Sequence, residues 1–106
     1  MKTINTSMTH REIPWSGSIT ELSQLPGRVY VHLTTLEMET RFLQQTEAEG
    51  FTFPDGAKPT SREPAEIMAV NSDHTINYVG SNGRIAFRSA RKVGEKKLTR
   101  ITYWLL

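Results

Sequence analysis

The chain contains no cysteine in its 106 residues. This absence excludes disulfide bonds, thiolate metal sites and cysteine nucleophiles, and it suits a reducing compartment. No hydrophobic run approaches the roughly 18 residues that a membrane helix needs. The N-terminal residues are polar and lack the apolar stretch of a secretory signal. We therefore expect a cytoplasmic protein that has no membrane partner.

Histidine is scarce, and the histidines stand far apart in the sequence: His10, His32 and His74. They show no paired ligand spacing, and without cysteine a zinc site would lack its usual ligands. Magnesium bound by the carboxylate oxygens of Asp55, Asp73 or Glu66 stays open, although no spacing favours it. We expect no metal site and no cofactor.

No serine or threonine lies in a nucleophile elbow or beside an evident base. His32 and Glu39 flank one predicted strand–helix corner and could form an acid–base couple. His32, however, shares its predicted strand face with Arg28 and Tyr30, which is typical of a solvent-facing histidine. Glu39 falls in the first turn of a predicted helix, where the helix dipole favours an acid. We expect a protein that is not an enzyme, and a small enzyme using His32 and Glu39 is the less favoured alternative.

The net charge is only +2, but it is unevenly distributed along the chain. Residues 84–100 contain seven lysines and arginines and a single acid, Glu95. Residues 1–83 contain six basic and ten acidic side chains. Such an asymmetry predicts an anionic partner for the C-terminal part of the molecule.

The N-terminal half predicts two helices and a strand. Ser18 and Glu21 have the spacing of a capping box, which opens a short helix that Pro26 and Gly27 terminate. Residues 28–33 alternate between apolar and polar side chains, as a half-buried strand requires. A second capping box, Thr34 with Glu37, opens the main helix, and a glycine at position 50 ends it.

The C-terminal half predicts mostly strands. Residues 51–53 form a short strand after the main helix and complete a strand–helix–strand unit with residues 28–33, and the proline-rich segment 54–64 reads as a loop. Four strands then follow as a meander at 66–71, 75–79, 84–90 and 98–104, with a hairpin turn at 80–83. The fold class is therefore α+β, with a mostly antiparallel sheet, one main helix and one short N-terminal helix. Residues 1–14 are expected to form a flexible arm, and residues 15–106 a single domain.

The basic segment provides the candidate binding site. If the strands at 84–90 and 98–104 pair, their arginines share a surface on which guanidinium groups bind phosphate or carboxylate. Aromatic side chains nearby could stack on a base. The candidate ligand-binding residues are Arg84, Arg88, Arg91, Lys92, Arg100, Tyr78 and Trp104. The alternative is a charged edge hairpin whose lysines resist strand-to-strand aggregation.

Several segments carry a resemblance to known sequences. They are RVYVHL at 28–33, RFL at 41–43, EAEGFTF at 47–53, IMAV at 67–70 and TINYVG at 75–80. Together they resemble small uncharacterised proteins of Gram-positive bacteria and their phages. The resemblance implies no catalytic motif. It implies, by analogy of size and origin, a phage-encoded antagonist of host defence.

These patterns together predict a non-enzymatic binding protein. Its partner would be an anionic small molecule such as a nucleotide signal, or an acidic or nucleic-acid-binding surface of a host defence protein. The alternative is a nucleic-acid-binding accessory protein. Sequestering a nucleotide would suit a homo-oligomer, for which residues 103–106 offer an apolar contact.

Overall fold

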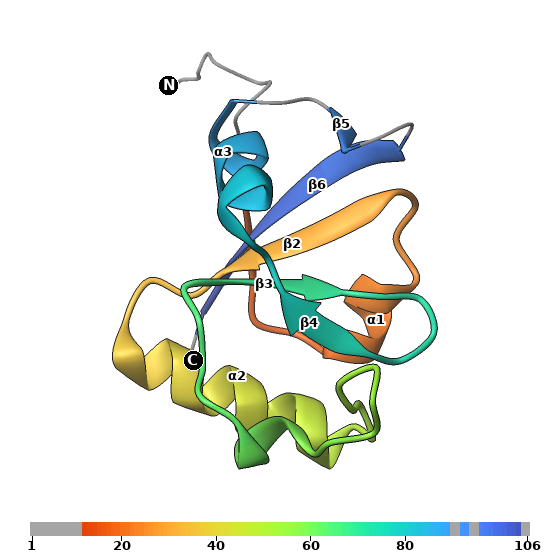
Figure 1. Cartoon of the computed structure of the whole chain (residues 1–106), viewed down its shortest axis with the longest axis vertical. Coiled ribbons are helices and arrows are strands. Elements are labelled where there is room, and N and C mark those ends of the chain that lie inside the picture. The colour runs from red at the N-terminus through yellow and green to blue at the C-terminus, as the bar shows by residue number, and fades with distance from the viewer. Residues whose placement is uncertain (1–11, 90–91, 94–95, 105–106) are drawn as a thin grey trace.

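A computed structural model describes residues 12–89, 92–93 and 96–104. The fold is α+β, with helices on both faces of one mixed sheet (Figure 1). The elements follow the chain in this order: β1 (Ile13–Trp15), α1 (Ile19–Ser23), β2 (Arg28–His32), α2 (Leu36–Ala48), the 3₁₀ helix η2 (Pro59–Ser61), β3 (Ile67–Val70), β4 (Ile76–Tyr78), α3 (Ser81–Ser89), β5 (Lys92–Val93) and β6 (Lys96–Tyr103). Among the described residues, no helix is long and apolar enough to cross a membrane.

The last strand, β6, lies inside the sheet, whose order is β1-β6-β2-β3-β4. It runs parallel to β1 and β2, whereas β2–β3 and β3–β4 are antiparallel. The predicted mostly antiparallel sheet is therefore wrong, and of the predicted meander only the β3–β4 hairpin forms. Because β6 buries Leu98 on one face and Ile101 on the other, it suits an interior position better than a sheet edge.

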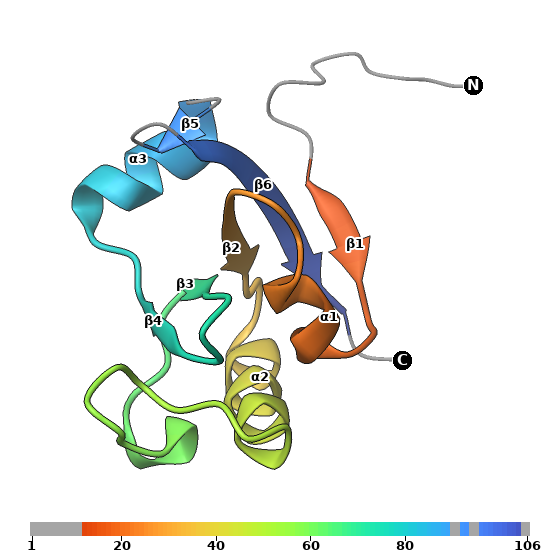
Figure 2. The same cartoon turned by 90° about the vertical axis from the view of Figure 1, so that its right-hand side faces the viewer.

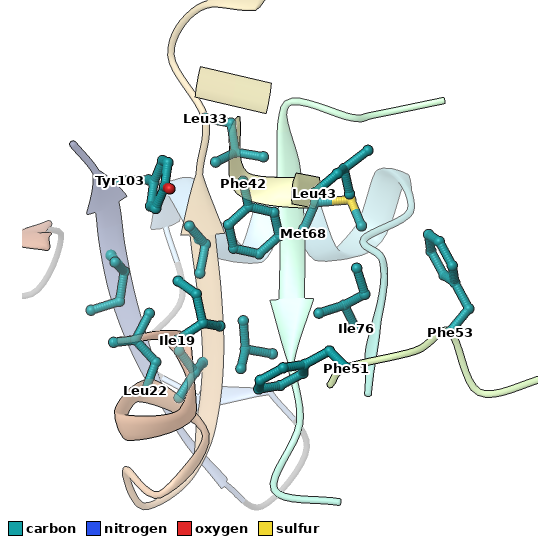
Figure 3. Close-up of a cluster of buried hydrophobic side chains, with 14 residues drawn as sticks. Ile19, Leu22, Leu33, Phe42, Leu43, Phe51, Phe53, Met68, Ile76 and Tyr103 are labelled. Atoms are coloured by element: carbon teal, nitrogen blue, oxygen red, sulfur yellow. The ribbon is translucent and has the colours of Figure 1, made fainter. Parts of the chain in front are cut away.

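One face of the sheet packs against α1 and α2 and forms the larger core (Figure 3). Val29 and Val31 of β2, with Leu33 just beyond it, point into this core, as the predicted alternation requires. Burying such a side chain stabilises the fold by about 1.5–3 kcal/mol. The residues labelled in Figure 3 are Ile19, Leu22, Leu33, Phe42, Leu43, Phe51, Phe53, Met68, Ile76 and Tyr103.

The opposite face packs against α3 and forms a second, smaller core (Figure 2). Tyr30 of β2 lies in this core together with Phe87 of α3 and Leu98 of β6. Only 8% of the Tyr30 surface is exposed, so β2 is covered on both faces. The prediction that β2 is half-buried, with Tyr30 facing solvent, is therefore wrong.

Helix α3 replaces the strand predicted at 84–90, and residues 80–83 are not a hairpin turn. The Arg84 N–H donates to the Gly80 oxygen at 2.9 Å and so begins the helix. The helix lies so close to β4 that a Cβ at Gly83 would stand 2.2 Å from the Val79 side chain. Gly83 thus allows α3 to pack closely against the segment that follows β4. It does not form the hairpin turn that was predicted from it.

The helix ends follow the sequence signals closely. The Ser18 hydroxyl accepts the Glu21 N–H at 3.3 Å, so the predicted cap of α1 is confirmed. Helix α2 is capped by Thr35, which accepts the Met38 N–H at 3.1 Å, and the predicted cap at Thr34 is one residue too early. Gly50 ends α2 with a φ of 86°, which favours glycine and confirms the prediction.

Two boundaries differ from the expectation. Ile13 and Pro14 pair with β6, so the described end of the predicted 1–14 arm belongs to the sheet, and residues 1–11 lie outside the described part of the chain. The strand predicted at 51–53 is reduced to one isolated bridge between Thr52 and Thr75. The strand–helix–strand unit therefore does not form.

Candidate functional site

The predicted binding residues do not gather on one surface. Arg100 is buried, with 4% of its surface exposed, and it faces the C-terminal turn of α3. Its guanidinium donates hydrogen bonds to the main-chain oxygens of Phe87 and Ala86, the latter at 3.2 Å. Burial lowers the pKa of Arg100, and the charge of Glu12 opposes this effect. Arg100 is thus a structural cation at a helix C-terminus, where the helix dipole favours it.

The candidate stacking residues lie away from the lysines of β5 and β6. The Tyr78 hydroxyl donates to the Glu63 oxygen at 2.6 Å, and its ring lies 5.4 Å from that of Phe53. Trp104 is half exposed, but it follows the end of β6 opposite to Lys96. Base stacking beside these lysines is therefore not supported. Tyr103 is buried in the larger core, so it cannot form the predicted apolar contact between subunits.

Exposed cations lie on α3, on β5 and where β6 begins (Figure 1), although the two arginines of α3 reach Glu66, which lies beside His32 toward the other end of β6. We call this group the basic end: Arg84, Arg88, Lys92, Lys96 and Lys97. Helix α3 and strand β5 are in contact there (Figure 2). Arg91 was also predicted to bind, but it lies outside the described residues.

The basic end surrounds the edge of the fold and does not line a single patch. Lys92 stands directly opposite Lys97 in the β5–β6 pair, so both project from the same face. Lys96 points to the other face, which is the one that α3 covers, because side chains alternate along β6. Cations on two faces suit an extended partner better than a small ligand held in one pocket.

Among the described residues, Glu66 is the only carboxylate that forms an ion pair with the basic end. Its oxygens lie 3.0 Å from Arg84 and 3.9 Å from Arg88. Both arginines remain at least half exposed, with side-chain exposures of 51% and 67%. No carboxylate in the described part of the chain lies within 4.0 Å of the three lysines.

A small hollow of about 260 Å³ lies beside α3, and we call it the His32 hollow. Its lining residues are Glu12, His32, Ile67, Phe87 and Arg88. The His32 ring nitrogens lie 3.1 Å from Glu12 and 3.2 Å from Glu66. A neutral imidazole has one N–H, so only the imidazolium donates to both carboxylates.

The predicted pairing of His32 with Glu39 is wrong, because both ring nitrogens face other carboxylates. The partner Glu12 precedes β1 and also accepts a hydrogen bond from Thr102. No sequence signal indicated this contact, since it requires β6 to lie between β1 and β2. The hollow offers acid and base groups, but its carboxylates are held by His32, Thr102 and the arginines of α3.

No group of three or more metal-binding side chains is found in the described ranges. No protein-family model matches the chain, no curated protein matches it, and no solved structure matches its fold.

Proposed function

We propose that this protein is a non-enzymatic binding protein whose basic end contacts the phosphate backbone of a nucleic acid. The observation that carries the proposal is the cross-strand pair of Lys92 and Lys97. Like charges directly opposite each other destabilise a strand pair. Within the described ranges no carboxylate offsets this repulsion, so a bound anion would relieve it.

The arrangement of the cations favours a polymer over a mononucleotide at the basic end. Lys92 and Lys97 project from one face, and Lys96 from the other. A polyanion can contact both faces at once and release a counterion for each phosphate that it presents. Arg100, one of the guanidinium groups predicted to bind an anionic ligand, is instead hydrogen-bonded to α3.

The contacts of such a surface would not read sequence. No exposed aromatic side chain of the described residues accompanies the lysines, since Tyr78 and Trp104 lie elsewhere. Contacts to phosphate fix orientation, whereas contacts to base edges give specificity. We therefore infer binding that depends on charge and tolerates any sequence. A chain of this kind could antagonise host defence by covering nucleic acid that a nuclease would otherwise reach.

The proposal is tested by fluorescence anisotropy with a labelled DNA duplex. Binding should weaken steeply as salt rises, and an unlabelled duplex of another sequence should compete equally well. Unlabelled polyglutamate, matched in charge concentration, serves as the mimic of an acidic protein surface. Equal competition by polyglutamate would favour an acidic protein as the partner, and a duplex that causes no anisotropy change at low salt would overturn the proposal.

A further inference from the structure

A second hollow, of about 390 Å³, opens beside the β3–β4 turn, and we call it the β3–β4 hollow. Its volume lies within the roughly 300–1,000 Å³ that small-molecule sites occupy. Its charged and amide-bearing lining residues are Arg28, Asn71, Asp73, Asn77 and Lys96. None of these residues lines the His32 hollow.

The register of the sheet places two of these side chains on one face. Asn77 lies opposite Ala69, which lies opposite Tyr30, so all three point to the face that α3 covers. Arg28 precedes Tyr30 by two residues and therefore shares this face. The Arg28 and Asn77 side chains of the hollow thus continue the α3 face of the sheet beyond the part that Tyr30 and α3 fill.

The same alternation brings a lysine next to Arg28. Arg28 lies opposite Leu98 of β6, and Lys96 precedes Leu98 by two residues. Arg28 and Lys96 are both exposed, and no carboxylate of the described residues lies within 4.0 Å of either. Asp73 is the only acid that lines the hollow, so its lining carries one net positive charge.

A hydrogen-bonded amide network forms the wall opposite the two cations. The Asn71 amide donates to the Thr75 hydroxyl at 3.0 Å and to the Asn77 side-chain oxygen at 2.7 Å. The Asn77 amide in turn donates to the Tyr78 main-chain oxygen at 3.0 Å. These bonds hold both asparagines in one orientation, which is the preorganisation that specific ligand recognition needs.

The turn that carries this wall is itself anchored to the rest of the fold. The His74 ring stacks on Phe51 with 3.9 Å between ring centroids. Its Nε2 lies 2.9 Å from the Glu49 main-chain oxygen, at the end of α2. His74 adopts a φ of 70°, which is uncommon for a residue other than glycine and persists because these contacts hold it.

Apolar groups complete the hollow. Leu25 and Pro54 contribute to its lining, whereas the side chains of Val29 and Val70, which also border it, are buried in the larger core on the other face of the sheet. A ligand that fits would therefore present an anionic group to Arg28 and Lys96, and a flat or ring-shaped body with polar edges to the apolar and amide surfaces. Phosphate suits the two cations, because ionised hydrogen bonds to it are short and strong.

We propose that the β3–β4 hollow binds a small organic phosphate of mononucleotide size. The phosphate lies between Arg28 and Lys96, and the polar edge of the base faces Asn71 and Asn77. This site shares Lys96 with the basic end but does not include the Lys92–Lys97 pair, so variants of Arg28 and of Lys92 distinguish the two proposals.

The test is an NMR titration of the ¹⁵N-labelled chain with the four common nucleoside monophosphates, with the matching nucleosides and with inorganic phosphate. At least one monophosphate should cause saturable shifts at Asn71 and Asn77. The nucleosides and inorganic phosphate alone should bind at least about tenfold more weakly, because each provides only half of the contacts. Equal binding of inorganic phosphate, or no saturable shift with any monophosphate, would overturn the proposal.

Two variants separate this site from the basic end. Arg28→Met should weaken monophosphate binding at least about tenfold while leaving duplex binding within about twofold. Lys92→Ala should do the reverse. Arg28 is exposed, so its loss should leave the melting temperature almost unchanged. If Arg28→Met leaves monophosphate binding intact, the assigned site is wrong even when the duplex still binds.

Discussion

Lys92 of β5 stands directly opposite Lys97 of β6, and both side chains are exposed. An antiparallel pair brings such residues to within about 4.5–5.5 Å at their Cβ atoms. The two ammonium groups therefore repel each other, and no ion pair in the described part of the chain compensates them. The Lys92–Lys97 pair therefore lowers the stability of the isolated protein, and an anionic partner bound to it would offset the repulsion.

Lys97→Glu should therefore change stability and binding in opposite directions. The new carboxylate would pair with Lys92 and raise the free energy of unfolding by about 0.2–1 kcal/mol. The same substitution would weaken duplex binding, because it removes one cation and adds one anion at the basic end. Urea denaturation and anisotropy measure the two effects. Lys58→Glu, an equal charge change at an exposed position after α2, is the control and should leave duplex binding much less affected.

Glu66→Gln should strengthen duplex binding severalfold. Glu66 pairs with Arg84 at 3.0 Å and with Arg88 at 3.9 Å, so its neutralisation exposes more positive charge on α3. Glu12→Gln is the matched control, because Glu12 also contacts His32 but forms no ion pair with an α3 arginine among the described contacts. Anisotropy at low salt compares the two variants. Equal gains in both would show that general charge, and not the two arginines, controls the affinity.

Arg100→Met should destabilise the fold by about 1–3 kcal/mol, because it leaves main-chain oxygens of α3 without their donor. These oxygens belong to Phe87 and Ala86, and the guanidinium that serves them is buried. Arg88→Met removes an exposed guanidinium from α3 and should cost less than about 0.5 kcal/mol. Urea denaturation of both variants provides the comparison. Equal stabilities would contradict the structural role assigned to Arg100.

Glu49 should make the stability depend on pH. Burial raises the pKa of Glu49, but hydrogen bonds from Gln45, Thr20 and the Ile19 N–H outweigh it, and the pKa lies at about 2. Its ordinary value is 4.5, so the folded state holds the carboxylate more strongly than the unfolded state does. The stabilisation is complete above the ordinary value and is lost as the pH falls from 4.5 towards 2.

The magnitude expected from Glu49 is about 1–2 kcal/mol, since partial exposure to solvent weakens the interaction below the full linkage value. Urea denaturation at pH values across that window measures it. Glu49→Gln should be less stable than the wild type at neutral pH and should lose less stability on acidification. Glu37→Gln, at an exposed position on the same helix, is the control and should keep the wild-type pH dependence.

The local signals in the sequence were sufficient for helix ends and for part of the sheet. The start of α1 was predicted from a serine with an acid three residues later. The end of α2 was predicted from a glycine after an apolar periodic segment. The alternation in residues 28–33 gave β2, and the apolar run before the 72–74 turn gave β3. These features depend on neighbouring residues alone, which is why sequence reasoning found them.

Long-range pairing was decisive where the sequence failed. Ile85 and Phe87 are apolar and two residues apart, as on one face of a strand. In α3 only Phe87 is buried, and Ile85 is 63% exposed. The helix forms because Phe87 covers the second face of the sheet and because Gly83 lets the helix lie close to Val79. The burial of Arg100 could not be predicted either, because it depends on β6 lying between β1 and β2.

The salt dependence of duplex binding tests the central claim most directly. The measurement compares the wild type with Lys92→Ala/Lys97→Ala and with the charge-matched control Arg41→Ala/Lys58→Ala, whose side chains are exposed in α2 and directly before η2. If the basic end contacts phosphates, the slope of log K against log salt should fall in magnitude by about 1.8 in the first variant, and hardly at all in the control. An unchanged slope in the lysine variant, or an equal change in both variants, would contradict the account.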